Sequence, residues 1–304
     1  MSYANKPHGN RRHHHGGQSR YGGGGNRPNT PRTPQTTLTP PPPQRQKRFI
    51  DINTDFGQSA DKRLFEPIET SLLSYVSSVN IPCCVHDGTP REVLEAIVTA
   101  KQSNCVVGAH IGYPDPANSG YAEMNISDED LVAWLYVQLG TFRALVQANG
   151  IDVDHVRPHG ALYAQMIDNP ELTRLVAETL YKVNPWYILI GPAGPVLDEV
   201  AQKVGIRTAP EMYIGKRYTN TGVLDKARLH ESLASQAALD QARQLLNDNS
   251  VTASDGTVVK VKKFGTLHIS PRQDGAVMIA EKLKIMLGQP YPLSLASVGD
   301  SGWV

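Results

Sequence analysis

Short apolar runs alternate with longer stretches of helical periodicity from about residue 49 to residue 287. Apolar runs of about four to eight residues are typical of buried strands, whereas apolar residues three and four positions apart indicate helices. This pattern predicts strands at 49–55, 79–85, 105–110, 151–156, 187–190, 205–209 and 264–269. Because strands and helices alternate along the whole segment, we expect a parallel sheet covered by helices.

The helices between these strands have recognisable start signals. Thr89-Pro90 predicts an N-cap followed by a proline at the first helical position, for a helix that ends near Lys101. Ser127 precedes three acidic residues in the first turn of a long helix, and Asn169-Pro170 opens another that ends near Val183. Further helices are predicted at 61–77, up to 204, at 229–246 and up to 287, and a hairpin is expected around 255–256.

Closure of the sheet into a barrel is favoured over an open, doubly wound sheet. Polar residues follow nearly every predicted strand, and a barrel gathers the carboxyl ends of all its strands around one axis. An open sheet would concentrate such residues at a single switch point, and no GxGxxG follows the first strand. We therefore predict one α/β barrel domain over residues 48–290, followed by a tail at 291–304.

The first 47 residues differ in composition from the rest of the chain. They contain basic residues but no acidic ones, together with runs of histidine, glycine and proline and almost no apolar side chains. Such a segment buries too little apolar surface to offset the entropy of ordering, so we expect a disordered arm. Its arginines and tyrosines could contact nucleic acid. We interpret the arm as a solvated extension and do not expect nucleic acid as a partner.

Other compositional features point to the cytoplasm. No apolar run approaches the roughly 18 residues that a membrane span requires, and the N-terminus lacks the apolar core of a secretory signal. Cys83, Cys84 and Cys105 are an odd number of cysteines, and two of them are adjacent. This pattern is typical of a protein in a reducing compartment. We expect a cytoplasmic protein without a membrane partner.

The polar residues near the strand ends are the candidates for chemistry. They are Asp51, Asn53, Asp55, His86, Asp87, His110, His159, Glu211 and His268. Two mechanisms could use them. Carboxylates and neutral imidazoles could hold a divalent metal ion that activates water, with Asp55, His86 and His110 as the candidate ligands. Alternatively, histidine and aspartate could perform general acid–base catalysis without a metal. Because no HExxH occurs, the sequence leaves both open.

Among these segments, Arg157 to Tyr163, read as RPHGALY, is the clearest candidate for a catalytic loop. A strand that runs into proline, histidine and glycine has to turn where the imidazole of His159 is presented. Glycine also allows the backbone to approach a ligand closely. We therefore expect His159 to face a site at the end of its strand.

Five segments together resemble the LamB/YcsF lactam-utilization family, which includes the A subunit of 5-oxoprolinase. The segments are DINTDFG, NIPCCVHDGTP, GAHIGYPD, RPHGALY and ASDGT, and the similarity spans about residues 50–288. The resemblance implies an irregular seven-stranded TIM-like barrel, similar to the glycoside hydrolase/deacetylase fold. It also implies opening of a cyclic amide, such as 2-pyrrolidinone or 5-oxoproline, with partner subunits that use ATP. We interpret the chain as a fungal or other eukaryotic member.

The family motifs carry functional roles onto residues of this chain. The implied catalytic residues are Asp55, His86, His110 and His159, with Asp55 and a histidine orienting water and His159 acting as the acid. The implied substrate-binding residues are Asp51, Asn53, Arg157, Tyr163 and Glu211. No GxxxxGK[ST] phosphate-binding loop occurs in the sequence, so ATP is expected to bind to a partner.

Some loops depart from the family pattern. The acid and arginine of a FADR-like loop are replaced by Gly215 and Lys216, which removes a candidate anion-binding arginine. This departure favours an uncharged lactam over 5-oxoproline. Two alternatives remain at this stage: a stand-alone metal-dependent deacetylase or amidase of the same barrel class, and a diverged non-catalytic member.

Overall fold

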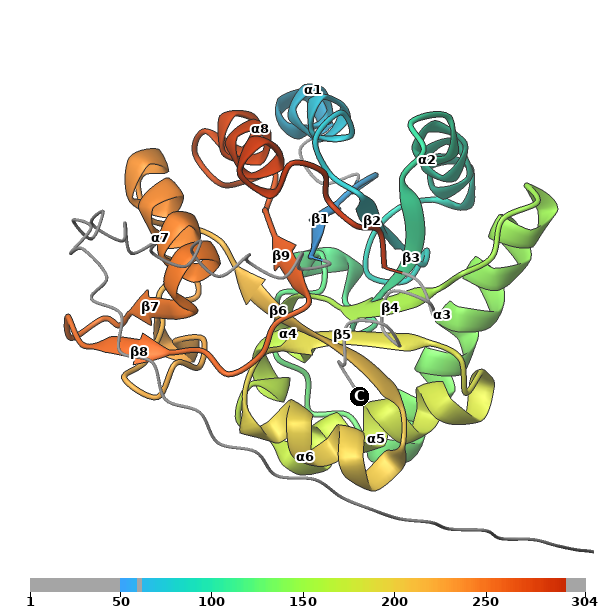
Figure 1. The fold of residues 1–304 in the computed structure, drawn as a ribbon. Helices are drawn as coiled ribbons and strands as arrows, with labels where there is room; N and C mark the ends of the chain where they lie inside the picture. Colours follow the sequence, from blue (N-terminus) through green and yellow to red (C-terminus); the bar gives the residue numbers. More distant parts are fainter. Residues whose placement is uncertain (1–49, 59–61, 294–304) are drawn as a thin grey trace, which may run out of the picture. The chain divides into compact units, whose positions relative to one another are not determined.

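A computed structural model of the chain describes residues 50–58 and 62–293. The predicted arm at 1–47 and all but the first residues of the predicted tail at 291–304 lie outside these residues, so the domain boundaries remain a prediction. Within the described part, the strands form a closed parallel barrel, which confirms the predicted fold class (Figure 1). The strand order around the barrel is β1-β2-β3-β4-β5-β6-β9.

All seven barrel strands are short and largely buried. Their bounds are β1 (Asp51–Asp55), β2 (Ser78–Pro82), β3 (Val106–Ile111), β4 (His155–Pro158), β5 (Ile188–Pro192), β6 (Arg207–Tyr213) and β9 (Thr266–His268). The barrel closes where β9 pairs with both β1 and β6, placing Thr266 opposite Asp51 on one side and opposite Glu211 on the other. The predicted hairpin forms outside the barrel as the antiparallel pair β7 (Ser250–Thr252) and β8 (Val258–Lys260).

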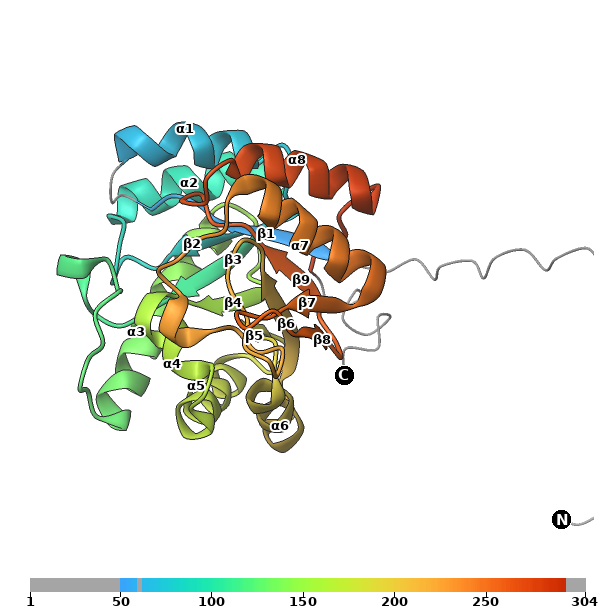
Figure 2. The same cartoon turned by 90° about the vertical axis from the view of Figure 1, so that its left-hand side faces the viewer.

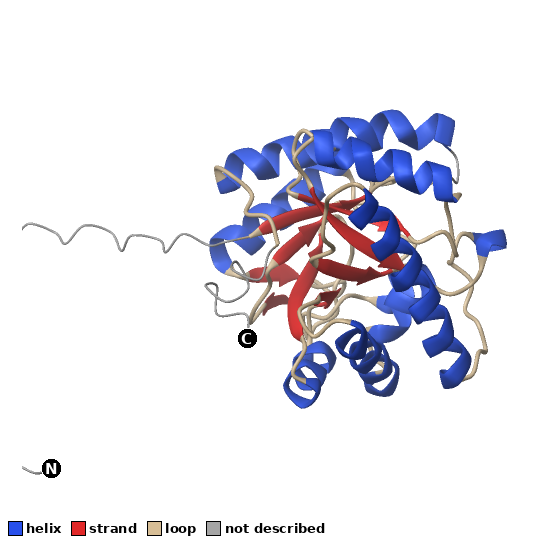
Figure 3. Ribbon diagram, turned by 90° about the vertical axis from the view of Figure 1, so that its right-hand side faces the viewer, coloured by secondary structure: helices blue, strands red, loops and turns tan. Residues whose placement is uncertain are grey.

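Helices surround the strands on the outside of the barrel (Figures 2 and 3). They are α1 (Lys62–Leu72), α2 (Pro90–Gln102), α3 (Asp128–Ala148), α4 (Gly160–Met166), α5 (Pro170–Val183), α6 (Pro195–Val204), α7 (Ser235–Asp248) and α8 (Ala276–Leu287). Alternate strand residues such as Ile52, Val79 and Val107 are fully buried in the apolar cluster that these helices share. In the described part of the chain, no helix is both long and apolar enough to cross a membrane.

The three helix starts predicted from capping residues are confirmed, whereas the helix predicted to start at residue 229 starts at Ser235. The hydroxyl of Thr89 accepts a hydrogen bond from the Glu92 N–H, while the Glu92 carboxylate accepts one from the Thr89 N–H, which is a complete capping box. Ser127 caps α3, and Asn169 caps α5 immediately before Pro170. These caps satisfy backbone donors that would otherwise lack partners in the first helical turn.

Several predicted boundaries are wrong, each for a local reason. Helix α1 ends at Leu72 and not at residue 77, because the Ser77 N–H already bonds to the Ile52 carbonyl and so belongs to the sheet. Strand β6 starts at Arg207 and not at Gly205, which has a positive φ and ends α6. The same strand extends to Tyr213, so Glu211 lies within it. Strand β4 similarly begins at His155 and extends through Pro158.

The interior of the barrel is polar. TIM-type barrels are usually filled with branched aliphatic residues, which pack in layers between the strands. Here the interior side chains form a continuous hydrogen-bonded set in which every member is buried: Asp51, Asn53, Asp55, Ser78, Asn80, His110, His155, Arg157, Glu211, Thr266 and His268. This hydrogen-bonded set extends from the amino ends of the strands to their carboxyl ends.

Candidate active site

Asp51 lies at the amino end of β1, at the base of the barrel. Its carboxylate accepts hydrogen bonds from the hydroxyls of Ser77, Ser78 and Thr266 at 2.6 to 2.9 Å. Burial raises the pKa of Asp51 to about 6, although the three hydroxyls act in the opposite direction. Asp51 and Asp55 are four positions apart along β1, which is roughly 13 Å at the usual rise per residue. The prediction that Asp51 contacts substrate is not supported by this placement, because the side chain closes the base of the barrel.

Asn53 and Asn80 connect the base of the barrel to its charged centre. The Asn53 amide donates to Glu211 at 3.0 Å and to the Thr266 hydroxyl at 2.7 Å, and its carbonyl faces Nδ1 of His268 at 2.7 Å. Asn80 donates to the Asn53 carbonyl at 2.8 Å. All four hydrogen-bonding positions of Asn53 are engaged by protein groups. We conclude that Asn53 orients its neighbours.

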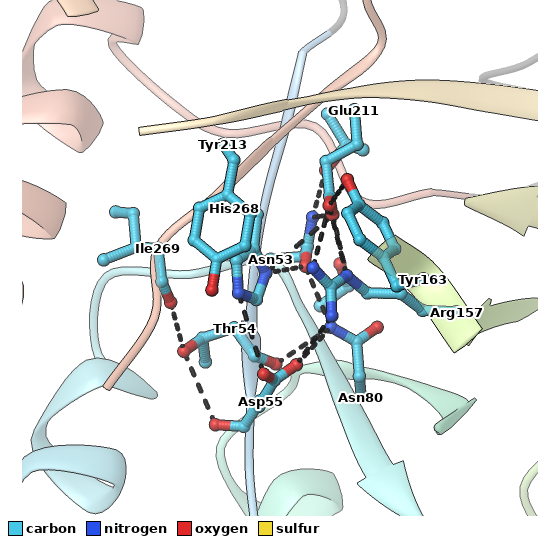
Figure 4. A network of polar contacts seen from close by, with 12 residues as sticks. Asn53, Thr54, Asp55, Asn80, Arg157, Tyr163, Glu211, Tyr213, His268 and Ile269 are labelled. Carbon is cyan, nitrogen blue, oxygen red and sulfur yellow. Dashed lines mark hydrogen bonds and ion pairs between the residues drawn. The ribbon is translucent and has the colours of Figure 1, made fainter. Parts of the chain in front are cut away.

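Arg157 and Glu211 form the charged centre (Figure 4). The guanidinium Nε and Nη2 each lie 2.9 Å from a different carboxylate oxygen of Glu211, and Nη1 lies 3.4 Å from Oδ1 of Asp55. Tyr163 adds a hydroxyl donor to Glu211 at 2.7 Å, and its ring lies 4.6 Å from Cζ of Arg157. Burial alone would raise the pKa of Glu211, but the charges of Arg157 and His268 outweigh it and lower that pKa. Glu211 is therefore ionised and holds Arg157 in place.

Asp55 ends β1 and has nitrogen partners from three strands. Its carboxylate lies 3.2 Å from Nε2 of His110, 3.4 Å from Nη1 of Arg157 and 3.7 Å from Nε2 of His268. Burial acts to raise the pKa of Asp55, but His110 and Arg157 outweigh it and hold that pKa well below its usual value. Asp55 is consequently an ionised, partly enclosed carboxylate at the carboxyl end of the barrel.

His110 and His159 meet in an arrangement that requires a cation. Nδ1 of His110 lies 2.9 Å from the Arg157 carbonyl oxygen, and Nε2 of His159 lies 2.8 Å from the Ser119 carbonyl oxygen. Because carbonyl oxygens only accept, both outer nitrogens carry hydrogen. In neutral rings, the inner nitrogens then have lone pairs, yet His110 Nε2 and His159 Nδ1 are only 2.9 Å apart. A proton or a metal ion between them removes this repulsion.

The charges of the neighbouring residues lead to the same conclusion. Asp55 and Glu211 are two buried carboxylates, and Arg157 supplies a single buried positive charge between them. Burial lowers the pKa of His159 to about 3, and the neighbouring His110 adds to the effect. His110 is also the ring next to Asp55. One further positive charge at this position balances the site.

The same three side chains fit a divalent metal ion. Potential ligand atoms of Asp55, His110 and His159 all lie within 4.8 Å of one another, and each side chain is buried. Both imidazoles direct their outer N–H to a backbone carbonyl, as metal-binding histidines usually do. A bound divalent metal would supply Lewis-acid activation of water. The set differs from the predicted one, because His159 takes the place of His86.

His86 lies behind His159. Its ring stacks on that of His159 with centroids 4.4 Å apart and planes 12° apart, so its in-plane nitrogens point past its neighbour. The side chain is 1% exposed, and the Gln138 side chain is its hydrogen-bonding neighbour. Burial lowers the pKa of His86 well below its usual value. His86 was predicted to be catalytic, but in the structure its neutral ring packs against His159.

A cavity of about 530 Å³ opens at the carboxyl ends of the strands. Of the predicted site residues, Asp55, Arg157, His159 and Tyr163 line it, whereas Asp51, Asn53, His86, His110 and Glu211 are not among its lining residues. The remaining walls come from loops and include Tyr121, Tyr213, Lys216, Lys226, Ser270 and Arg272. His159 is therefore the only imidazole of the described trio His86, His110 and His159 that faces the cavity.

Two glycines allow the loop after β3 to reach His159. A Cβ atom at Gly160 would lie 2.2 Å from the Gly120 carbonyl oxygen, and that oxygen accepts the Ala161 N–H at 3.0 Å. The close contact brings the Ser119 carbonyl to His159 and packs the Tyr121 ring 4.8 Å from the imidazole. The glycine of RPHGALY thus serves close backbone approach, as predicted, although the approaching group is another loop of the chain.

Asn80, Tyr121, Tyr213 and Lys216 are among the site residues that were not predicted from the sequence. Asn80 had a usable signal, because it occupies the same alternating face of its strand as Ser78. Tyr213 is two residues beyond Glu211 and would have been found had β6 been extended. Tyr121 and Lys216 lie in loops, where no periodic pattern indicates which way a side chain points.

The fold and the site define a class of protein: a parallel α/β barrel with a carboxylate and imidazole centre at the carboxyl ends of its strands. Comparison with known proteins then identifies the family. The model of the LamB/YcsF family matches residues 50–291, and the chain belongs to that family.

Relatives and a solved structure agree with this membership. The chain is 31% identical over 251 residues to the A subunit of 5-oxoprolinase from Histophilus somni, covering 82% of this chain and 99% of the relative. It is 33% identical over 239 residues to the corresponding protein of Neisseria meningitidis, covering 77% and 94%. The crystal structure of a lactam utilization protein from Thermus thermophilus is 30% identical, with a TM-score of 0.71 over 80% of this chain and 98% of that one. These relatives are bacterial and do not support the expected eukaryotic origin.

Proposed function

We propose that this chain is the hydrolytic subunit of an ATP-dependent enzyme that opens a cyclic amide, either 2-pyrrolidinone or 5-oxoproline. The observation that carries the proposal is the Asp55, His110 and His159 cluster, which has an unbalanced negative charge at the wall of a cavity. The names of the relatives, which refer to 5-oxoprolinase and to lactam utilization, support the choice of a cyclic amide.

The hydrolytic step requires water to add to the amide carbon and the ring C–N bond to break, with a proton delivered to the nitrogen. Asp55 and His159 both line the cavity, so they are the groups that reach substrate and water. Asp55 orients the water, and the proton that the water loses replaces the one that the His110 and His159 pair gives to the nitrogen. The lactam ring nitrogen receives the proton that His110 and His159 share, with His159 as the acid, because the Nε2–H of His159 is committed to the Ser119 carbonyl. His110 relays charge between the two.

ATP enters this scheme through a partner protein. Lactams with five-membered rings are stable amides, and phosphorylation of the lactam oxygen makes the amide carbon more reactive. Addition of one water and cleavage of the C–N bond then give an acyl phosphate, which a second water converts to a carboxylate and inorganic phosphate. The sequence contains no GxxxxGK[ST] loop for ATP phosphates. The word "subunit" in the names of the relatives supports a multi-subunit enzyme. We propose ATP-using oxoprolinase or lactamase subunits as the partners, and the cytoplasm as the compartment in which three free cysteines remain reduced.

Growth on lactams tests this function. A strain from which this chain has been deleted should fail to grow with either 2-pyrrolidinone or 5-oxoproline as its sole nitrogen source. Re-introduction of the native chain should restore growth, whereas the Asp55→Ala, His110→Ala and His159→Ala variants should not, provided that each accumulates as folded protein. Normal growth of the deletion strain on both lactams would refute the proposal.

A stand-alone metal-dependent amidase or deacetylase is the alternative that a specific observation favours. Asp55, His110 and His159 would hold the metal, and the backbone carbonyls that fix both imidazoles would orient them. Metal analysis of the purified chain and hydrolysis of a lactam or an N-acetyl compound without ATP separate the two functions. Chelator-sensitive hydrolysis by the isolated chain would favour the alternative, and strict dependence on ATP and a partner would exclude it.

A further inference from the structure

The cavity needs a positive group for any substrate that carries a carboxylate, and Arg157 does not supply it. Arg157 uses Nε and Nη2 for Glu211 and Nη1 for Asp55. A guanidinium binds a carboxylate with two parallel N–H donors, and in Arg157 the Nε and Nη2 donors that do so are already bonded to Glu211. The predicted role of Arg157 in binding the substrate's carboxylate therefore conflicts with its contacts. Another cation has to be found in the cavity wall.

Besides Arg157, the cations that line the cavity are Arg272, whose Cζ lies 4.6 Å from the centroid of the Phe65 ring, and two lysines, whose environments differ. Lys226 forms an ion pair with Asp168 at 2.7 Å, so its charge is already matched. Nζ of Lys216 donates to the Glu231 backbone carbonyl and to the Ser232 hydroxyl, each at 3.0 Å. Both acceptors are uncharged, and no carboxylate of the residues that the structure describes forms an ion pair with Lys216. An ammonium group has three donors, which leaves one for a ligand.

Lys216 is also held in a defined position. The carbonyl of Lys216 accepts a hydrogen bond from the Gln241 side chain at 2.7 Å, and the same side chain accepts the Gly215 N–H at 2.9 Å. The Gly215 carbonyl accepts the Leu233 N–H at 2.8 Å. The loop is therefore fastened on both sides of the lysine, which reduces the entropy that a ligand would have to remove on binding.

The ammonium group lies close to the charged centre of the site. Nζ of Lys216 and Cζ of Arg157 are each 5.7 Å from the centroid of the Tyr213 ring, so the two cations share that ring as a neighbour. Tyr213 and Ser232 line the cavity together with Lys216. Burial lowers the pKa of Lys216, which indicates that its charge has lost hydration without gaining a full counterion. An anionic ligand in the cavity would supply that counterion.

We propose that Lys216 binds the carboxylate of the substrate and that the cavity therefore selects a carboxylate-bearing lactam, such as 5-oxoproline, over an uncharged one, such as 2-pyrrolidinone. The inference rests on the proposed function and reverses the preference expected from the loss of the arginine in this loop. A lysine at this position retains the positive charge. The substrate's ring would then lie between Lys216 and the Asp55 and His159 side chains.

Direct binding of the two lactams to the purified chain tests this assignment. They differ by one carboxylate, so isothermal titration of each measures what that group contributes. The native chain should bind 5-oxoproline at least about tenfold more tightly than 2-pyrrolidinone, since a hydrogen bond to a charged group contributes roughly 1.5 to 3 kcal/mol. Lys216→Met should abolish that preference, and Lys216→Arg should retain most of it. Lys226→Met is the matched control and should bind as the native chain does.

Each outcome has a distinct meaning. Equal binding of both lactams by the native chain, or an unchanged preference in Lys216→Met, overturns the role of Lys216 and leaves the proposed function standing. If the native chain binds neither lactam, the proposed function and this inference both fail. A melting temperature measured for every variant shows whether a loss of binding reflects unfolding.

Discussion

Arg157 and Glu211 form a two-pronged ion pair in the barrel interior, with 2.9 Å between each guanidinium nitrogen and its carboxylate oxygen. Removal of one partner of such a pair leaves an uncompensated buried charge. Glu211→Gln should therefore lower the free energy of unfolding by about 3 to 5 kcal/mol. Tyr163→Phe, which removes only one hydrogen bond to Glu211, should cost about 1 kcal/mol. Urea unfolding measures both, and equal losses would contradict the assigned role of Glu211.

The stacked pair His86 and His159 allows a matched test of which imidazole acts in catalysis. The two rings are almost parallel, but only His159 lines the cavity. His86→Phe preserves an aromatic ring in the stack and changes no residue that lines the cavity, so growth on lactams should persist. His159→Phe makes the same change in the other ring and should abolish growth. Loss of growth in both folded variants would return His86 to the catalytic set.

Glu69 gives a prediction about pH. Its side chain is buried on α1 and accepts the Gly57 N–H at 2.8 Å, and burial raises the pKa of Glu69 to about 7. The folded state thus keeps a proton that the unfolded state loses near pH 4.5. The stability that this gives is fully present below about pH 4.5 and is lost as the pH rises through 7.

Glu69→Gln removes this titration while keeping a hydrogen-bond acceptor for Gly57. Relative to the variant, the native chain should be more stable at about pH 4.5 than at about pH 8.5, by on the order of 3 kcal/mol. Unfolding free energies of both proteins across this range provide the measurement. A difference between them that stays constant with pH would show that Glu69 is ionised throughout.

Gly108 makes room for His155 inside the barrel. A Cβ atom at Gly108 would lie 2.0 Å from Nε2 of His155, which is far inside van der Waals contact. Gly108→Ala should therefore cost about 1 to 3 kcal/mol in unfolding free energy. In a His155→Ala background the same change should cost much less, because the obstructing ring is gone. Additive losses in the double variant would show that the two positions are not coupled.

The alternation of polar and apolar residues in β1 explains how much of the site could be predicted. A period of two places Asp51, Asn53 and Asp55 on one face of the strand, and the structure directs all three into the barrel. However, the pattern does not predict how far along the barrel axis each side chain lies from the cavity. Only Asp55 reaches the cavity, because the other two lie nearer the amino end of the strand.

Long-range contacts explain what could not be predicted. His86 and His159 both come near strand ends and look equivalent in sequence. Only His159, however, donates a hydrogen bond to the Ser119 carbonyl, which fixes the orientation of its ring. Lys216 occupies a loop whose position depends on Gln241, a residue 25 positions away in sequence. Such pairings arise from tertiary structure. The replacement of an arginine by Lys216 in this loop therefore does not by itself predict which substrate the cavity favours.

The polar barrel interior has a consequence for how this chain can change. An aliphatic core tolerates substitution when volume is preserved, because one methyl group replaces another. In this interior, each donor is matched to an acceptor from Thr266 through Asn53 and Glu211 to Asp55, so a single replacement leaves a buried group without its complement. Saturation mutagenesis should therefore find the fewest tolerated substitutions at the residues of the barrel interior. Natural substitutions there should occur in pairs, with a donor and its acceptor changing together.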